Sequence, residues 1–247
     1  MSQTCTHHVM NVPEPGLFEI AFASYLFSSL PDSDDAYNSF REQVPGEVDL
    51  NDPAHLGHLI TFLRGMRCRQ FTEDGEPHAR RALKNWYLKF EHNLPAHGTN
   101  IWMLTDPMLN EIQKAYGDLV TVKAGERKNC NYVKVGPTGA AKILFALRPR
   151  SLMAWDDKIA ACTVGGADAE SYVRFLRMVK DMVAKLEREC SVHDIRLEQL
   201  PERLGRTEAI TIPKLIDEYL WQTLTQKRLL PSPQFLGDWR NWSSVGT

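Results

Sequence analysis

The segment from residue 168 to residue 189 constrains the fold of this chain more than any other. Its apolar residues recur at spacings of three and four, which places them on one side of an α-helix. Those residues are Tyr172, Phe175, Leu176, Val179, Met182, Val183 and Leu186. A helix with one apolar face of this length needs a hydrophobic core to cover it. The segment therefore predicts a globular protein in which helices pack on one another.

Several other segments carry helical patterns or helix starts. Asp52-Pro53 places a capping residue ahead of a proline at the first helical position, and Asp106-Pro107 also opens a helix. We expect helices over 17–30, 52–63, 78–90, 106–116, 168–189 and 211–224, a hairpin with its helix over roughly 130–148, and a shorter helical segment after Asp32. Alternating strand patterns are scarce, and only Leu119–Val122 suggests a strand. The sequence therefore predicts an all-α protein.

Composition narrows the class of protein further. The 247 residues are 43% apolar and 24% charged, as in ordinary globular proteins, and we expect them to form one unit spanning 1–247. The five cysteines show no CxxC spacing, and His55 and His58 lack a third ligand, so we expect no disulfide framework and no metal site. Without a long apolar run or a signal-peptide pattern, we expect a cytoplasmic protein that does not enter a membrane.

Charge is unevenly distributed along the chain. Residues 1–60 contain nine acidic residues and one basic residue, whereas residues 114–158 contain nine basic residues and four acidic ones. A second basic cluster consists of Arg64, Arg67, Arg69, Arg80, Arg81, Lys84 and Lys89. A protein with a net charge of only −2 can still present one positive face to phosphates. Charge alone leaves this reading and chance clustering equally open.

A glycine-rich hairpin at Val135-Gly136-Pro137-Thr138-Gly139 opens an apolar helix. Gly136 can adopt a positive φ without a Cβ clash, and Pro137 suits the first turn of a helix. Backbone N–H groups at a helix start have no partner within the helix and can bind an anion. The hairpin by itself is compatible with phosphate binding and with an ordinary helix start.

A carboxylate follows this helix in the stretch Trp155-Asp156-Asp157-Lys158-Ile159. Asp156 has the position of an N-cap residue, a role worth about 1 kcal/mol to a helix. An acid placed beside a bound phosphate could instead act on the attached nucleotide. Asp157 fits an ordinary acid in the first helical turn, which the helix dipole favours.

The hairpin, the apolar helix and the apolar-Asp-x-x-Ile helix start resemble the helix-hairpin-helix DNA glycosylase superfamily over residues 128–162. The resemblance implies a two-lobed helical fold with an active-site cleft between the lobes, here 1–105 plus 165–230 and 106–164. It also implies that Asp156 is the catalytic aspartate. Further, it implies that a DNA phosphate is held by the backbone of Gly136, Thr138 and Gly139, with Lys134 and Lys142 as additional phosphate contacts.

The chain departs from the family pattern in ways that have consequences. Val133-Lys134-Val135-Gly136-Pro137 stands where the family often has Leu-Pro-Gly-x-Gly, and Thr138 stands where bifunctional members carry a nucleophilic lysine. This implies a monofunctional enzyme that uses water. No four-cysteine cluster follows, which argues against the iron–sulfur branch, and we expect no cofactor. Lys142 is expected to be an ordinary surface residue or phosphate contact.

The resemblance also implies a mechanism and a partner. A monomer would bind double-stranded DNA and rotate one nucleotide out of the duplex. Asp156 would stabilise the positive charge on the sugar as the base departs and would activate the attacking water. Trp155 is a candidate for the base pocket, although a core position is the favoured reading of this residue. The excised base would be damaged or modified, and some bacterial relatives remove modified phage bases in antiviral defence.

Two alternatives remain open at this point. The chain could be a non-catalytic helix-hairpin-helix protein that binds DNA, in which Asp156 only caps a helix. It could also be an N-glycosidase of the same fold that acts on free nucleosides or nucleotides. Salt-dependent DNA binding would separate the DNA-directed functions from the last one.

Overall fold

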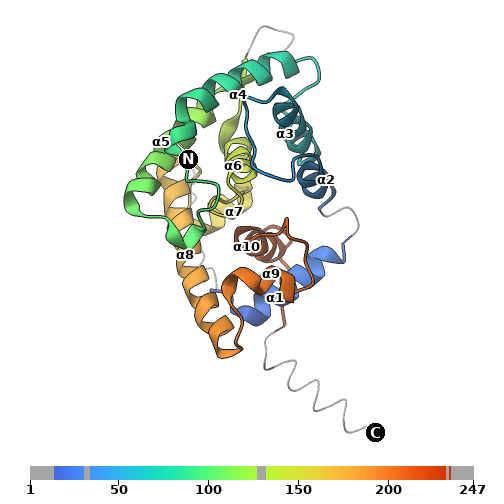
Figure 1. Cartoon of the computed structure of the whole chain (residues 1–247), viewed down its shortest axis with the longest axis vertical. Coiled ribbons are helices and arrows are strands. Elements are labelled where there is room, and N and C mark those ends of the chain that lie inside the picture. Colours follow the sequence, from blue (N-terminus) through green and yellow to red (C-terminus); the bar gives the residue numbers. More distant parts are fainter. Residues whose placement is uncertain (1–13, 31–33, 127–131, 232–233, 235–247) are drawn as a thin grey trace, which may run out of the picture.

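The computed structural model describes residues 14–30, 34–126, 132–231 and 234, and these are mostly helical (Figure 1). The helices are α1 (Leu17–Ser28), α2 (Asp35–Gln43), α3 (Pro53–Gly65), α4 (Glu76–Phe90), α5 (Asp106–Thr121), α6 (Gly136–Leu147), α7 (Asp157–Thr163), α8 (Ala169–Val192), α9 (Leu200–Arg203) and α10 (Ile212–Leu220). Short helical turns occur at η1 (Glu91–Asn93), η2 (Ile101–Met103) and η3 (Leu197–Gln199), and a π-helix, η4 (Trp221–Thr225), extends α10. The all-α expectation is confirmed.

The sequence signals for helix starts agree with the structure. The Asp52 carboxylate accepts a hydrogen bond from the Ala54 backbone N–H at 2.7 Å, so the capping role predicted for this residue is confirmed. The longest described helix, α8, buries the apolar face that its spacing predicts, including Tyr172 and Leu186. Its N-cap is Asp168, which accepts a hydrogen bond from the Ser171 N–H at 2.7 Å.

The strand suggested at Leu119–Val122 is wrong. Leu119 lies in the last turn of α5, on the same buried face as Ile112 and Tyr116, so burial with the long helix outweighs a short alternating pattern. The described strands come directly afterwards, as β1 (Lys123–Glu126) and β2 (Tyr132–Lys134), and they pair antiparallel. A two-stranded hairpin thus connects α5 to α6.

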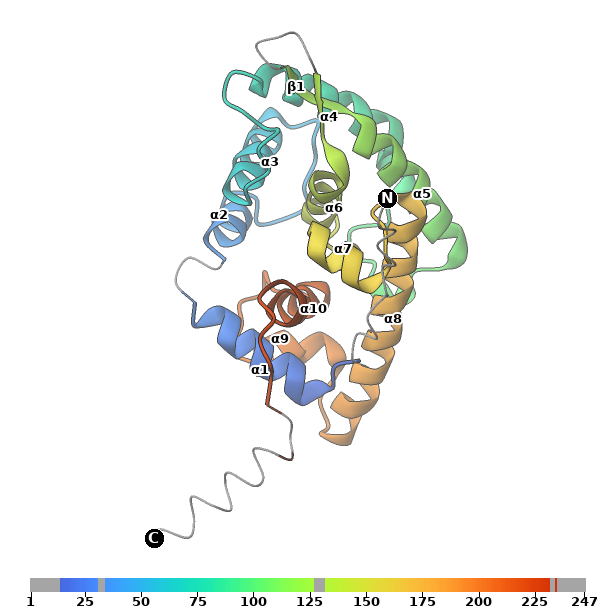
Figure 2. The same ribbon diagram turned by 180° about the vertical axis from the view of Figure 1, so that it is seen from behind.

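Helix α6 lies at the centre of the molecule (Figures 1 and 2). It packs against α3 and α5, and α5 in turn packs against α8. Almost every residue from Gly139 to Leu147 is buried. Alanines at positions 140, 141 and 146 keep the helix narrow, which lets its neighbours approach closely.

Two helices from opposite ends of the described chain, α1 and α10, pack together below this central helix (Figures 1 and 2). The long helix α8 packs against both of them and also against α5 and α7. In the described part of the chain, no helix combines the length and the apolar character needed to cross a bilayer. Cys5, Cys130 and the tail containing Trp239 and Trp242 lie outside the described residues.

Candidate functional site

A cavity of about 370 Å³ lies between α1 and α10 on one side and α2, α3 and α6 on the other. This volume falls in the range of small-molecule sites. Its aromatic lining consists of Phe27, Tyr37, Phe62, Phe145, Trp155 and Trp221. Its charged lining consists of Asp34, Arg67, Lys142, Asp156, Lys214 and Asp217. The cavity therefore offers flat apolar surfaces together with groups that can donate, accept or transfer protons.

Asp156 lines this cavity and is held by both of its carboxylate oxygens. Oδ1 accepts a hydrogen bond from the Ile159 backbone N–H at 2.8 Å, so Asp156 is the N-cap of α7. Oδ2 accepts a hydrogen bond from Thr225 Oγ1 of η4 at 2.7 Å. Its own helix and the chain's C-terminal segment together fix the direction of this half-buried carboxylate.

Asp157 occupies a different environment one residue later. Its side chain is exposed, and Oδ1 accepts a hydrogen bond from Thr138 Oγ1 at 2.9 Å. Asp157 is not among the residues that line the cavity. The two neighbouring aspartates therefore face different surroundings, one the cavity and the other the start of α6.

Trp155 belongs both to the core and to the cavity wall. Its side chain is buried, and its ring packs against Tyr116, Tyr172 and Phe175 at centroid distances of 5.1–6.0 Å. The indole Nε1 donates a hydrogen bond to the Pro137 carbonyl at 3.4 Å. This contact ties the residue before Asp156 to the first turn of α6.

Three of the residues expected to bind a phosphate, Gly136, Thr138 and Gly139, form the first turn of α6 and do not line the cavity. Gly136 has a φ of 72°, which favours glycine. A Cβ at Gly139 would lie 2.5 Å from Nε2 of Gln70, which covers this turn and donates a hydrogen bond to the Val135 carbonyl at 2.6 Å. The Asp157 carboxylate also lies at this turn, because it accepts the hydrogen bond from Thr138 Oγ1. Exposed Lys134 ends β2.

Lys142 lies one turn further along α6 and lines the cavity. Its Nζ donates a hydrogen bond to the Met66 carbonyl at 2.9 Å. The structure thus places Asp156, Trp155 and Lys142 on one cavity, while Gly136, Thr138, Gly139 and Lys134 lie outside its lining.

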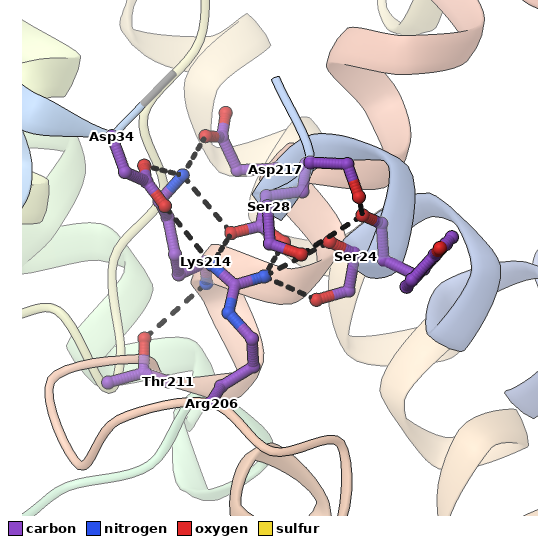
Figure 3. Close-up of polar contacts among 10 residues, drawn as sticks. Ser24, Ser28, Asp34, Arg206, Thr211, Lys214 and Asp217 are labelled. Carbon is purple, nitrogen blue, oxygen red and sulfur yellow. Dashed lines mark hydrogen bonds and ion pairs between the residues drawn. The ribbon is translucent and has the colours of Figure 1, made fainter. Parts of the chain in front are cut away.

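The sequence reasoning missed a cluster of buried charges next to the cavity (Figure 3). Lys214 of α10 is only 4% exposed, and its Nζ lies 2.8 Å from Asp34 Oδ1, 3.4 Å from Glu218 Oε1 and 3.9 Å from Asp217 Oδ2. The same ammonium lies 4.1 Å from the centroid of the Phe27 ring, a cation–π geometry. Lys214 therefore links α10 to α1 and to the start of α2.

Arg206 supplies the second cation of this cluster. Its guanidinium donates to both oxygens of fully buried Glu218, at 2.8 and 3.0 Å, and to Asp34 Oδ2 at 3.1 Å. It also donates to Ser24 Oγ of α1 at 2.5 Å. Two cations thus share Glu218 and Asp34. The contacts with Asp34 and Ser24 join segments that are distant in the sequence (Figure 3).

Burial changes the proton affinity of two groups on the cavity wall. Burial alone lowers the pKa of the Lys214 ammonium, but the carboxylates of Glu218, Asp217 and Asp34 outweigh it and raise that pKa. Burial raises the pKa of Asp217 to about 6, despite the opposing influence of Lys214. Asp217 therefore exchanges its proton close to neutral pH.

Replacing Asp217 with asparagine is expected to stabilise the fold at pH 8. The folded-state pKa of about 6 lies above the ordinary aspartate value of about 4, so the free energy of unfolding falls as pH rises from about 4 to about 6 and stays lower above that range. At about 1.36 kcal/mol per pKa unit, Asp217→Asn recovers up to about 3 kcal/mol at pH 8 and little at pH 4. Urea denaturation at pH 8 and pH 4 measures the change in the free energy of unfolding. An equal change at both pH values would contradict the prediction.

The missed residues did leave a weak sequence signal. Lys214, Asp217 and Trp221 are spaced three and four apart, so they share one side of the helix expected from residue 211. Charged residues within an otherwise apolar helix point to a buried polar site. Nothing local indicated that Asp34 and Arg206 would meet them.

The fold and the site together define an all-α protein with an aromatic, charged cavity that three aspartates line. In the part of the chain that the structure describes, no group of three or more His, Cys, Asp or Glu side chains is arranged to hold a metal ion. No protein-family model matches the chain, and neither a curated protein nor a solved structure matches it.

Proposed function

We propose that the protein is a monofunctional DNA glycosylase that hydrolyses the N-glycosidic bond of a damaged or modified base. The observation that carries this proposal is the Asp156 carboxylate, which is fixed by Ile159 and Thr225 and lines a cavity of about 370 Å³. A carboxylate held in this way can stabilise the cationic sugar that forms as the base departs and can accept a proton from the attacking water.

The remaining walls of the cavity suit a nucleobase. Enzymes that act on a base within DNA rotate it into a pocket and hold it by stacking and a few hydrogen bonds. Tyr37 and Phe145 stack with ring centroids 5.4 Å apart, and Phe27 meets Trp221 edge to face at 5.5 Å. These rings supply apolar faces, and the charged residues between them supply hydrogen-bonding groups.

The proposal includes the two-lobed arrangement that the family resemblance implies. We assign its cleft to the cavity, which α1, α2, α3 and α10 of the lobe 1–105 plus 165–230 line together with α6 of the lobe 106–164. The segment 128–162 that resembles the family contains β2, α6 and most of α7 among its described residues.

The experiment that tests the function is mass spectrometry of released bases. Purified protein is incubated with damaged, undamaged and phage-derived DNA, and the small-molecule fraction is compared with that of Asp156→Asn. We expect at least one base to be released by the wild-type protein and not by the variant. Release of no base from any of these DNAs would contradict the proposal.

Borohydride reduction during the reaction is expected to trap no covalent adduct between the protein and DNA. Thr138 occupies the position of the nucleophilic lysine in bifunctional members, and the Lys142 ammonium already donates to the Met66 carbonyl. Gel electrophoresis with labelled DNA checks this, with Lys142→Gln and Lys134→Gln as comparison variants. An adduct that disappears in either variant would show that the reaction does not use water alone.

A second candidate is an N-glycosidase that acts on free nucleosides or nucleotides. One observation favours it, because the Asp157 carboxylate stands at the start of α6 where a DNA phosphate is expected. In addition, Arg64 and Arg80 of the basic cluster both pair with Glu76, at 2.8 and 2.6 Å, which reduces the positive charge available to DNA.

Salt dependence of DNA binding distinguishes the two candidates. For the glycosylase, we expect the affinity for duplex DNA to fall at least about tenfold between 50 and 200 mM salt, because several phosphate contacts release counterions. Fluorescence anisotropy with a labelled duplex measures this affinity at each salt concentration. Binding too weak to detect at 50 mM salt, combined with hydrolysis of a free nucleoside, would favour the second candidate.

A further inference from the structure

We propose that Asp217 is a second catalytic carboxylate, which donates a proton to the departing base while Asp156 acts on the sugar. The inference rests on the proposed function, and it assigns opposite roles to two aspartates of one cavity. It also defines the substrate as a base that leaves poorly unless a ring nitrogen is protonated.

The first support is the position of the two carboxylates. Asp156 precedes α7, whereas Asp217 lies in the middle of α10, and both line the same cavity. Helix α10 continues directly into η4, whose Thr225 donates to Asp156. One continuous C-terminal segment therefore carries Asp217 and also positions Asp156.

The second support is the charge balance around Asp217 (Figure 3). Lys214 and Arg206 are the cations of the cluster, and their short contacts are with Asp34 and Glu218. In the described part of the chain, Asp217 pairs with Lys214. The distance from Oδ2 to the lysine Nζ is 3.9 Å, which is too long for a hydrogen bond. Asp217 is thus the additional carboxyl group of a cluster whose other four charges balance.

The groups that act on Asp217 come from several elements. Lys214 and Glu218 lie on its own helix, Asp34 precedes α2, and Lys142 approaches from α6. Burial and the two neighbouring carboxylates favour the protonated form, and the two lysines oppose them. Burial has the largest influence and raises the pKa of Asp217 to about 6, which suits a proton donor that works near neutral pH.

The proposed step balances as follows. The Asp217 carboxyl proton passes to a ring nitrogen of the base, and the C1′–N bond breaks with its electron pair moving to the base. The Asp156 carboxylate stabilises the resulting cationic sugar. A water oxygen then bonds to C1′, and the water's proton passes to Asp156. Asp156 releases this proton to solvent, and Asp217 regains one from solvent after the neutral base departs.

This role predicts which bases the cavity can process. A neutral purine needs protonation to leave, whereas a base that already carries a positive charge, such as 7-methylguanine, leaves without it. We therefore infer a neutral base as the substrate. Loss of Asp217 should penalise release of a neutral base far more than release of a charged one.

The test compares Asp217→Asn and Asp156→Asn with the wild-type protein on the DNA that yields a base, across pH 5 to 8.5. Single-turnover release by the wild type should decline above about pH 6. We expect Asp217→Asn to be about 100-fold slower at pH 6 and to lose this decline. Exposed Asp106→Asn serves as the control and should keep the wild-type profile.

A readout independent of activity accompanies the pH profile. Carbon-13 NMR of aspartate-labelled protein should show one carboxyl that titrates near pH 6 and is missing from the spectrum of Asp217→Asn. A carboxyl signal of Asp217 that titrates near pH 4 would overturn the inference. Unchanged rate and pH profile in Asp217→Asn, with Asp156→Asn inactive, would overturn it while leaving the proposed function intact. Absence of base release by the wild type would overturn the proposed function, and this inference with it.

Discussion

Replacing Asp156 with asparagine is expected to slow base release by about 10²–10³-fold. This effect is typical of losing one preorganised electrostatic contact to a transition state. The substitution removes the negative charge that faces the developing cationic sugar and the group that accepts a proton from water. It keeps the size and the hydrogen-bonding oxygen of the side chain. The measurement is single-turnover release of the base identified by mass spectrometry.

The fold of Asp156→Asn should stay intact, because asparagine caps helices about as well as aspartate. Its amide oxygen can accept the Ile159 N–H in place of Oδ1. Asp168→Asn is a matched control, since Asp168 caps α8 through an equivalent contact with the Ser171 N–H. We expect this control to keep full activity. Near-normal release by Asp156→Asn would show that Asp156 is only a helix cap.

Replacing Lys214 with methionine is expected to lower the free energy of unfolding by about 3–5 kcal/mol, as when one partner of a buried ion pair is removed. Methionine fills a similar volume, so the loss comes from charge and not from a cavity. Asp34 would lose its 2.8 Å ion pair, and Glu218 its 3.4 Å contact. Arg206 alone would then face both carboxylates.

Lys89→Met is the matched control for this change. Lys89 pairs with Asp118 at the same 2.8 Å, but the lysine side chain is 63% exposed. Exposed pairs contribute about 0–1 kcal/mol, so we expect a small effect. Urea denaturation of both variants at pH 7 measures the difference. Equal losses would mean that burial does not strengthen the Lys214 contacts.

Local signals predicted the helices well and the short strands poorly. The caps at Asp52 and Asp156, and the apolar face of α8, depend on residues within one or two turns. The pairing of β1 with β2 depends on a connection between them and on the end of α5, so alternation over Leu119–Val122 was misleading. A pattern of four residues is too short to compete with a long buried helix.

The candidate site was predictable only where its parts are close in the sequence. Trp155 and Asp156 are adjacent, and Lys142 lies on the helix before them. Asp217 reaches the same cavity through the packing of α10, and the contact between Asp34 and Arg206 spans 172 positions. Such contacts carry no short-range spacing that a single sequence can reveal. The aromatic lining is divided among five helices and the segment before α7 for the same reason.

The packing of α1 against α10 has a consequence for how the chain is made. A ribosome releases the N-terminal part first, so α1 and Asp34 emerge well before Arg206 and Lys214 exist. Until Arg206 and Lys214 have emerged, Asp34 has neither cation and α1 lacks the cover of α10. The cavity therefore closes only after α10 has been made, and a chain stopped before residue 206 is expected to expose α1 to chaperones and proteases.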